Sequence, residues 1–320
     1  MNRRTAIQRL LVGGAGSFLP RLLGQAAPPQ NSPDDQETFI IRSDVRLVLL
    51  DVSVKSHDGG FVRGLEKENF KVFENGRPQT IRTFDSSDVP VTVGILVDES
   101  RSMTPKRTSV LVAAETFIQE SNREDEIFVL NFNNHIRLGL PHPMLFSDDL
   151  EQLHAALYRG IPDGKTALND AVVAGLEHLQ LGRREKKTLV IISDGGDNAS
   201  WFKRGDMLDR VEKGLATIYT IGLYDPDDPE IDPGLLRQLA RISGGEAFFP
   251  AKPPDTVPIC RQIAKDIRNR YTLGFLPQPG NGASSVRQIR VHVSAPGHGS
   301  LSAHTKSSYR YEAADASKKQ

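Results

Sequence analysis

Two nearly continuous apolar runs dominate the middle of the chain. They cover residues 91–97 and 188–193, and such runs are typical of parallel strands that are buried on both faces. Stretches of helical periodicity alternate with strand-like segments, which predicts helices near 105–121, 148–158, 167–181, 204–214, 233–243 and 255–270. We therefore predict an α/β domain over residues 89–270, with a doubly wound, mostly parallel, Rossmann-like sheet covered by helices on both faces.

The segments on either side of this domain have the pattern of β-strands. Residues 38–88 contain short runs of alternating apolar and polar residues, with turn signals at 57–60 and 74–76, and predict a small N-terminal β module. Residues 271–312 return to strands, including 271–275 and 288–293. We expect these C-terminal strands to pack with residues 38–88 in one small all-β sandwich, with the α/β domain inserted between them.

The N-terminus has the features of an export signal. Residues 1–27 begin with Arg3 and Arg4, continue through a short, weakly apolar stretch, and end in small residues, which is a twin-arginine-like pattern. Residues 28–37 are rich in proline and polar residues and predict a linker, and 313–320 predict a disordered tail. The rest of the chain has no apolar run long enough to span a membrane. We therefore expect an exported protein, periplasmic or extracellular, without a transmembrane segment in its mature form.

Charge and cysteine content exclude several classes of function. The chain has 40 basic and 40 acidic residues, so no global positive field attracts nucleic acid, and a partner must be recognised by a local site. The single cysteine, Cys260, lies in a predicted helix and is expected to be a buried structural thiol, because one cysteine cannot form an intrachain disulfide.

Five oxygen-bearing side chains follow or precede the buried elements of the α/β domain. Asp98, Ser100 and Ser102 come directly after the apolar run 91–97, Asp194 comes directly after the run 188–193, and Thr166 precedes the helix that leads to that second run. The carboxyl ends of parallel strands meet at one edge of a sheet, so we expect these side chains to converge there. Hard cations prefer oxygen ligands, and Mg²⁺ favours six-coordinate sites, so the set predicts a divalent metal site for Mg²⁺, with Mn²⁺ and Ca²⁺ as alternatives.

This arrangement resembles the metal-ion-dependent adhesion site (MIDAS) of von Willebrand factor A (VWA) domains. The resemblance rests on Asp98-x-Ser100-x-Ser102, on Thr166, and on Asp194 within the segment Ser-Asp-Gly-Gly-Asp-Asn, and it covers about residues 90–270. It implies that the serine and threonine hydroxyls are metal ligands and that the two aspartates bind directly or through water. It also implies an open coordination position that a Glu or Asp side chain of a protein partner fills.

The flanking strands resemble a bacterial group described as VWFA-related, through Gly64-Leu-x-x-x-x-Phe70 and Tyr271-Thr-Leu-Gly-Phe275. The chain departs from many relatives at Glu99 and Arg101, which place charges where small residues are common. We expect these two charges to influence the choice of partner. Asp197 and Asn198 are expected to cap the loop rather than to bind metal.

The resulting hypothesis is a non-enzymatic, adhesion-type module that recognises an acidic side chain of a partner protein through the metal. The alternative is a metal-dependent phosphoesterase that uses Asp98 as a nucleophile, although such enzymes usually carry a second acid where Ser100 stands. A third interpretation gives Asp98 a purely structural role, as the cap of the helix that begins near Pro105. The chain has no Gly-x-Ser-x-Gly motif, which argues against a serine hydrolase. The sequence does not determine the oligomeric state.

Overall fold

The structure is a computed structural model, and it describes residues 47–223, 231–278 and 284–312. The predicted export signal, the linker and the C-terminal tail lie outside the described residues. Of the helices in the described segments, none is long and apolar enough to cross a membrane.

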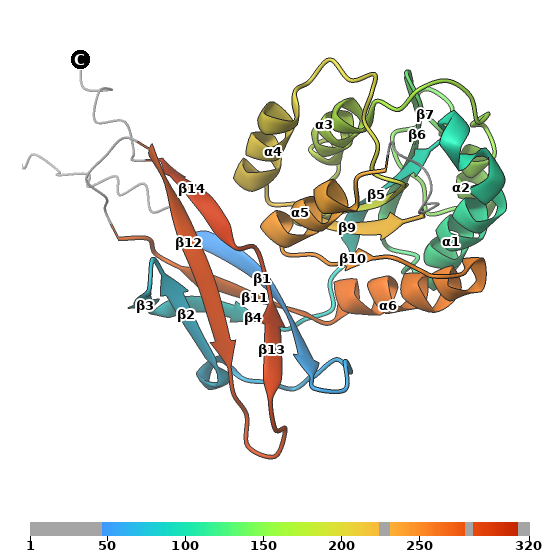
Figure 1. Cartoon of the computed structure of the whole chain (residues 1–320). Coiled ribbons are helices and arrows are strands. Elements are labelled where there is room, and N and C mark those ends of the chain that lie inside the picture. The colour runs from blue at the N-terminus through green and yellow to red at the C-terminus, as the bar shows by residue number, and fades with distance from the viewer. Residues whose placement is uncertain (1–46, 224–230, 279–283, 313–320) are drawn as a thin grey trace, which may run out of the picture. The chain divides into compact units, whose positions relative to one another are not determined.

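The α/β region is built around a six-stranded sheet (Figure 1). Its strand order is β10-β9-β8-β5-β6-β7, and every neighbouring pair is parallel except β6 and β7. The strands are β5 (Val91–Asp98), β6 (Glu126–Phe132), β7 (Ile136–Leu138), β8 (Lys186–Ser193), β9 (Thr217–Gly222) and β10 (Ala247–Phe248). The helices are α1 (Arg107–Glu120), α2 (Leu150–Leu157), α3 (Leu168–Leu179), α4 (Arg204–Lys213), α5 (Pro233–Ser243) and α6 (Thr256–Arg268).

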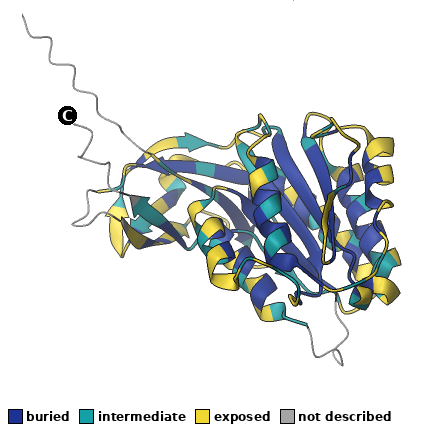
Figure 2. Cartoon of the chain, turned by 90° about the horizontal axis from the view of Figure 1, so that it is seen from above, coloured by how far each residue is buried: buried dark blue, intermediate teal, exposed yellow. Residues whose placement is uncertain are grey.

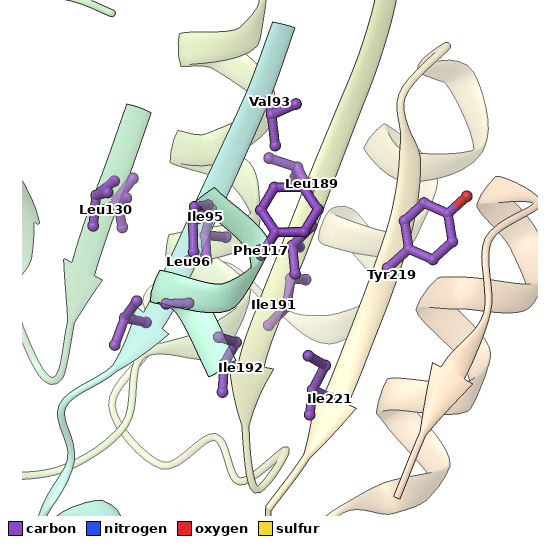
Figure 3. Close-up of a cluster of buried hydrophobic side chains, with 14 of the residues drawn as sticks. Val93, Ile95, Leu96, Phe117, Leu130, Leu189, Ile191, Ile192, Tyr219 and Ile221 are labelled. Carbon is purple, nitrogen blue, oxygen red and sulfur yellow. The ribbon is translucent and has the colours of Figure 1, made fainter. Parts of the chain in front are cut away.

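The apolar runs form the centre of this sheet. Every residue of β5 is buried, because helices cover both of its faces. Figure 3 shows side chains of β5, β8 and β9 lying together with Phe117 of α1 in one core. Gly94 interrupts the apolar run because the Phe128 ring of β6 fills the space that a side chain would need: a Cβ there would lie 2.3 Å from the ring. The burial pattern therefore explains both the run and the glycine within it.

Two element boundaries differ from the prediction. Pro105 lies in a 3₁₀ segment, Arg101–Lys106, and the α-helix begins only at Arg107, because the chain after β5 first turns across the edge of the sheet. Helix α2 begins at Leu150, and its N-cap is Asp149. The carboxylate of Asp149 accepts hydrogen bonds from the backbone N–H groups of Glu151 and Gln152.

The flanking strands form two further four-stranded sheets, with the orders β13-β1-β11-β4 and β14-β12-β2-β3. The strands are β1 (Val48–Ser56), β2 (Phe70–Glu74), β3 (Arg77–Gln79), β4 (Ile81–Asp85), β11 (Arg270–Phe275), β12 (Ser284–Val293), β13 (Leu301–His304) and β14 (Ser308–Glu312). Strand β1 pairs antiparallel with β11, so strands from the two ends of the chain are direct neighbours.

Both flanking sheets contribute to one hydrophobic core, which is separate from the core of the α/β region (Figure 2). Leu50 of β1, Val72 of β2 and Leu273 of β11 are almost completely buried in it. The predicted fold class, an α/β domain flanked by a β-sandwich module from N- and C-terminal strands, is confirmed.

Candidate metal centre

The site lies at the carboxyl edge of the central sheet, where β5 and β8 end side by side. Val97 of β5 is the register partner of Ile192 of β8, so Asp98 and Asp194 open two adjacent loops. The parallel arrangement therefore brings together residues that are almost a hundred positions apart in the sequence.

The loop after β5 holds its three predicted ligands close together. The backbone N–H of Ser100 donates to Oδ1 of Asp98 at 2.9 Å, which turns the chain sharply after the strand. The hydroxyl oxygens of Ser100 and Ser102 then lie 3.1 Å apart. Three side-chain oxygens of this one loop thus face a common point.

Asp194 joins this group from the loop after β8. Its Oδ2 accepts a hydrogen bond of 2.6 Å from the Ser102 hydroxyl, and its Oδ1 accepts one of 3.1 Å from the N–H of Gly196. Gly195 has a φ of 87°, a left-handed conformation that favours glycine and that directs the chain away from the carboxylate. The structure therefore brings Asp98, Ser100, Ser102 and Asp194 together as the sequence predicts.

Thr166 belongs to a third loop that is bonded to both of the others. Its carbonyl oxygen accepts hydrogen bonds from the N–H groups of Asn198 and Ala199, at 2.9 and 3.0 Å, and its own N–H donates to Oδ1 of Asn198 at 2.9 Å. Two residues earlier, the carbonyl oxygen of Gly164 accepts a bond of 3.2 Å from Arg101. The main chain of Thr166 is thus fixed against the loop after β8, and the main chain of Gly164 is fixed against the loop after β5.

The two aspartates are buried as a like-charged pair. Asp98 is 2% exposed and Asp194 is 3% exposed. Burial and then the charge of Asp194 raise the pKa of Asp98 to about 7, although hydrogen bonds from serines act in the opposite direction. Lys106 forms an ion pair of 3.7 Å with Asp194, so this one ammonium group faces two buried carboxylates.

Two residues that the sequence analysis did not single out complete the surroundings. The Ser193 hydroxyl donates to Oδ2 of Asp98 at 2.6 Å and accepts from the N–H of Gly195 at 3.0 Å. The ammonium nitrogen of Lys106 lies 3.7 Å from Oδ2 of Asp194, beyond hydrogen-bond distance, and it is buried without a hydrogen-bond partner in the described chain. The sequence indicates Ser193 through its position at the end of β8, beside Asp98. The position of Lys106 depends on the 3₁₀ segment, which the sequence pattern does not predict.

The donor set fits a hard divalent cation. Within residues 47–223, 231–278 and 284–312 no cluster of three or more histidine, cysteine or acidic side chains could hold a metal. A metal at this edge would therefore depend on hydroxyl oxygens in addition to the two carboxylates. Two buried carboxylates without a hydrogen-bonded cation, beside hydroxyls on fixed loops, match the oxygen ligands and the charge that Mg²⁺ requires.

The two charged residues of the first loop have different positions. Glu99 is 3% exposed and forms an ion pair with Arg107, and burial raises the pKa of its carboxyl group. Its side chain fills the space beside Gly160, so Glu99 offers no exposed charge in this structure, and its influence on the choice of partner stays a prediction. Arg101 is exposed and pairs with Asp163 at 3.1 Å, so it is available at the surface.

The interpretation of Asp98 as the cap of the helix near Pro105 is wrong. The N-cap of α1 is Lys106, and no side chain caps that helix end. Asp98 bonds instead within its own loop and to Ser193. Asp197, in contrast, accepts hydrogen bonds from Asn169 and Ser200, and Asn198 from Thr166, so both act as loop caps as expected.

Comparisons with known proteins agree with this architecture. Residues 93–196 match the sequence profile of the family described as the von Willebrand factor type A domain. No curated protein matches the chain in sequence. Among solved structures, a von Willebrand factor type A protein from Catenulispora acidiphila is 14% identical, with a TM-score of 0.50, and the match covers 76% of this chain and 73% of that one.

Two further solved structures are similar over part of the chain. The von Willebrand factor domain of the type V pili tip protein from Porphyromonas gingivalis is 13% identical, with a TM-score of 0.48, over 57% of this chain and 96% of that one. The manganese-loaded TRAP protein of Plasmodium vivax is 14% identical, with a TM-score of 0.44, over 73% and 96%. The profile match and the topology of the central sheet identify residues 93–196 as a von Willebrand factor type A domain.

Proposed function

We propose that Asp98, Ser100, Ser102, Thr166 and Asp194 hold a divalent cation, and that the chain binds an acidic side chain of a protein partner through it. The observation that carries this proposal is the pair of buried carboxylates, surrounded by hydroxyl oxygens and lacking a hydrogen-bonded cation. A buried charge is strongly unfavourable unless it is paired or coordinates a metal. A divalent cation would offset the charge of both carboxylates, and the ammonium group of Lys106, 3.7 Å from Asp194, would then leave one positive charge for a third.

The chain's own residues have distinct tasks in this scheme. Ser193 holds Asp98 by a hydrogen bond to Oδ2, and Gly196 holds Asp194 by one to Oδ1, so both carboxylates are oriented before any ligand arrives. Preorganisation of this kind reduces the entropy lost on binding. The metal we favour is Mg²⁺, because two carboxylates with neutral hydroxyls on fixed loops suit a small ion that retains water.

Calorimetry on the full chain tests the metal site directly. We expect heat on addition of Mg²⁺ or Mn²⁺, and an affinity at least about 100-fold lower for Asp194→Ala, because one of two charged ligands is lost. Asp163→Ala is the matched control: it removes a carboxylate from the neighbouring loop that is 70% exposed, and it should change the affinity by less than about twofold. Absence of heat in the wild-type protein would refute the proposal.

The phosphoesterase alternative receives less support from the geometry. A nucleophilic carboxylate must reach the substrate, whereas Asp98 is 2% exposed and both of its oxygens accept hydrogen bonds. We therefore propose a binding protein rather than an enzyme. Turnover of a generic phosphate ester by the wild-type protein that is lost in Asp98→Asn would reverse this conclusion.

We also propose export, on the basis of the sequence of residues 1–27. Fusion of this segment to a reporter enzyme that is active only outside the cytoplasm tests it. Replacement of Arg3 and Arg4 by lysine should abolish export if the twin-arginine route is used, and should leave it unchanged if the general secretory route is used.

A further inference from the structure

The sole tryptophan of the chain lies unprotected on a loop beside the candidate metal centre. Trp201 is 94% exposed, whereas the next residue, Phe202, packs against the hydrophobic core. Tryptophan is the side chain most enriched at the energetic centres of protein interfaces, and full exposure of its large apolar surface is unfavourable in an isolated protein. The exposed indole of Trp201 is therefore a suitable contact surface for a partner.

The backbone that presents Trp201 is held rigidly by the start of helix α3. The carboxylate of Asp170 accepts hydrogen bonds from the N–H groups of Trp201 and Phe202, at 2.9 and 2.8 Å. The amide nitrogen of Asn169 donates to Asp197 at 2.5 Å and to the carbonyl oxygen of Phe202 at 3.2 Å. The indole is therefore exposed because the loop is fixed in that position, not because the loop lacks contacts.

A hollow of about 590 Å³ lies next to this indole. Its lining includes Trp201, Ile231 and Leu235, and also Gly195, which directly follows the candidate ligand Asp194. The hollow and the metal centre therefore share the loop that follows β8. An extended peptide advances about 3.3 Å per residue, so a segment with an acidic side chain at the metal could place a residue within about three positions in the hollow.

The lining of the hollow carries charges of both signs. Asp232 is paired with Arg204 at 2.7 Å, and Asp197 accepts hydrogen bonds from Asn169 and Ser200. Lys165 and Lys203, on the loops before Thr166 and after Trp201, are exposed, and within the described chain their ammonium groups form neither hydrogen bonds nor ion pairs. Opposite potentials guide association and disfavour like-charged partners. The two lysines without partners are therefore the groups that would pair with acidic side chains of a bound segment.

We propose that the surface formed by Trp201, the hollow and the metal centre binds an acidic protein segment, in which an apolar side chain close to the metal-bound Asp or Glu fills the hollow against the indole. This inference rests on the proposed function and names the determinant of specificity that lies beside the metal. Trp201 is a contact residue for the partner and contributes no ligand to the metal.

A peptide selection on the full chain tests the proposal. Random peptides displayed on phage are selected on the immobilised protein in Mg²⁺, and one enriched peptide is synthesised. We expect enriched sequences with an Asp or Glu and a large apolar residue within about three positions of it. Because Trp201 is the sole tryptophan, its emission reports binding directly, and we expect a shift to shorter wavelength as the indole leaves water.

Two substitutions separate Trp201 from a non-specific apolar effect. Trp201→Ser should weaken binding of the synthetic peptide by about thirtyfold, the effect of losing an aromatic hot-spot residue. The substituted side chain has almost no contacts in the protein, so the fold should persist. Leu215→Ser is the matched control: it removes an apolar side chain that is 64% exposed at the start of β9, on the opposite edge of the sheet, and should leave the affinity unchanged.

The possible results distinguish this inference from the proposed function. Binding that requires Mg²⁺ but is equal in wild type and Trp201→Ser overturns the inference and leaves the metal-dependent function intact. Binding that is insensitive to chelator and to Asp194→Ala overturns the proposed function, and with it the inference. A selection that enriches no peptide overturns the binding surface, while calorimetry with Mg²⁺ still decides on the metal site.

Discussion

The carboxylates of Asp98 and Asp194 and the carboxylate of Glu74 are all nearly excluded from solvent, but their surroundings differ. In the β-sandwich, Oε1 of Glu74 accepts hydrogen bonds from the Arg287 guanidinium, at 2.9 Å, and from the Tyr309 hydroxyl. Opposite charges are paired there. At the edge of the central sheet, two like charges lie together and the nearest ammonium group is 3.7 Å from an oxygen.

This difference separates a structural cluster from a candidate binding site. The Glu74 cluster is complete, because its charge is neutralised by residues of the same chain. The two aspartates face only one ammonium group, so their negative charge is not fully neutralised. Such a buried charge persists in a folded protein only where the remaining structure stabilises it or a ligand neutralises it. The contrast leads to predictions with opposite signs for the two regions.

The first expected effect is on the paired cluster. Glu74→Gln leaves the Arg287 guanidinium buried without its counter-ion, and should lower the free energy of unfolding by about 3 kcal/mol. Denaturant unfolding measures this change. The double variant Glu74→Leu, Arg287→Met should regain most of the stability, because it removes both charges. A single variant as stable as wild type would mean that the ion pair does not stabilise the sandwich.

The aspartate pair should give the reverse result. The pKa of Asp98 is raised from its ordinary 3.8 to about 7, so the folded state binds this proton more tightly than the unfolded state does. In chelator, the contribution of Asp98 to stability should be greatest below about pH 4, decline as the pH rises, and reach its minimum above about pH 7.

Asp98→Asn isolates this contribution, because it removes the titrating group and keeps the shape. The difference in free energy of unfolding between the variant and wild type should grow in favour of the variant from pH 4 to pH 7, and excess Mg²⁺ should reduce it. Parallel stability curves for the two proteins would contradict the assignment of the raised pKa to Asp98.

The smallest expected effect concerns Lys106. Its ammonium group lies close enough to Asp194 to repel a bound cation but too far to form a hydrogen bond. Lys106→Met should therefore increase the affinity for Mg²⁺ by about fivefold, measured by calorimetry at low salt. Lys165→Met, which removes an exposed lysine of the neighbouring loop, should have less effect. Equal changes in the two variants would indicate a general effect of charge rather than a local one.

The sequence predicts the parts of the site that follow from strand order. The apolar runs identify β5 and β8, and the rule that parallel strands end at one edge places Asp98 beside Asp194. Side-chain directions within loops are not encoded in this way. Glu99 and Arg101 are both charged loop residues, yet one points into the protein toward Arg107 and the other to the surface.

The pattern of apolar and polar residues also does not predict features that depend on contacts between residues far apart in the sequence. The exposure of Trp201 results from hydrogen bonds to Asp170, more than thirty positions earlier, which no local periodicity reveals. The cap of α2 shows the same limit over a short distance: Ser147, Asp148 and Asp149 are all suitable residues, and only the folded geometry selects Asp149.

The pairing of β4 with β11 has a consequence for the modularity of the chain. Asp85 and Thr272 face each other across this antiparallel pair, although the entire α/β region is threaded between them. Directly opposed residues in such a pair are about 5 Å apart, so the inserted region leaves and re-enters the sandwich at essentially one point. A short turn in place of the α/β region would rejoin the two strands without altering their alignment, but it would remove contacts such as the ion pair of Arg310 with Asp209.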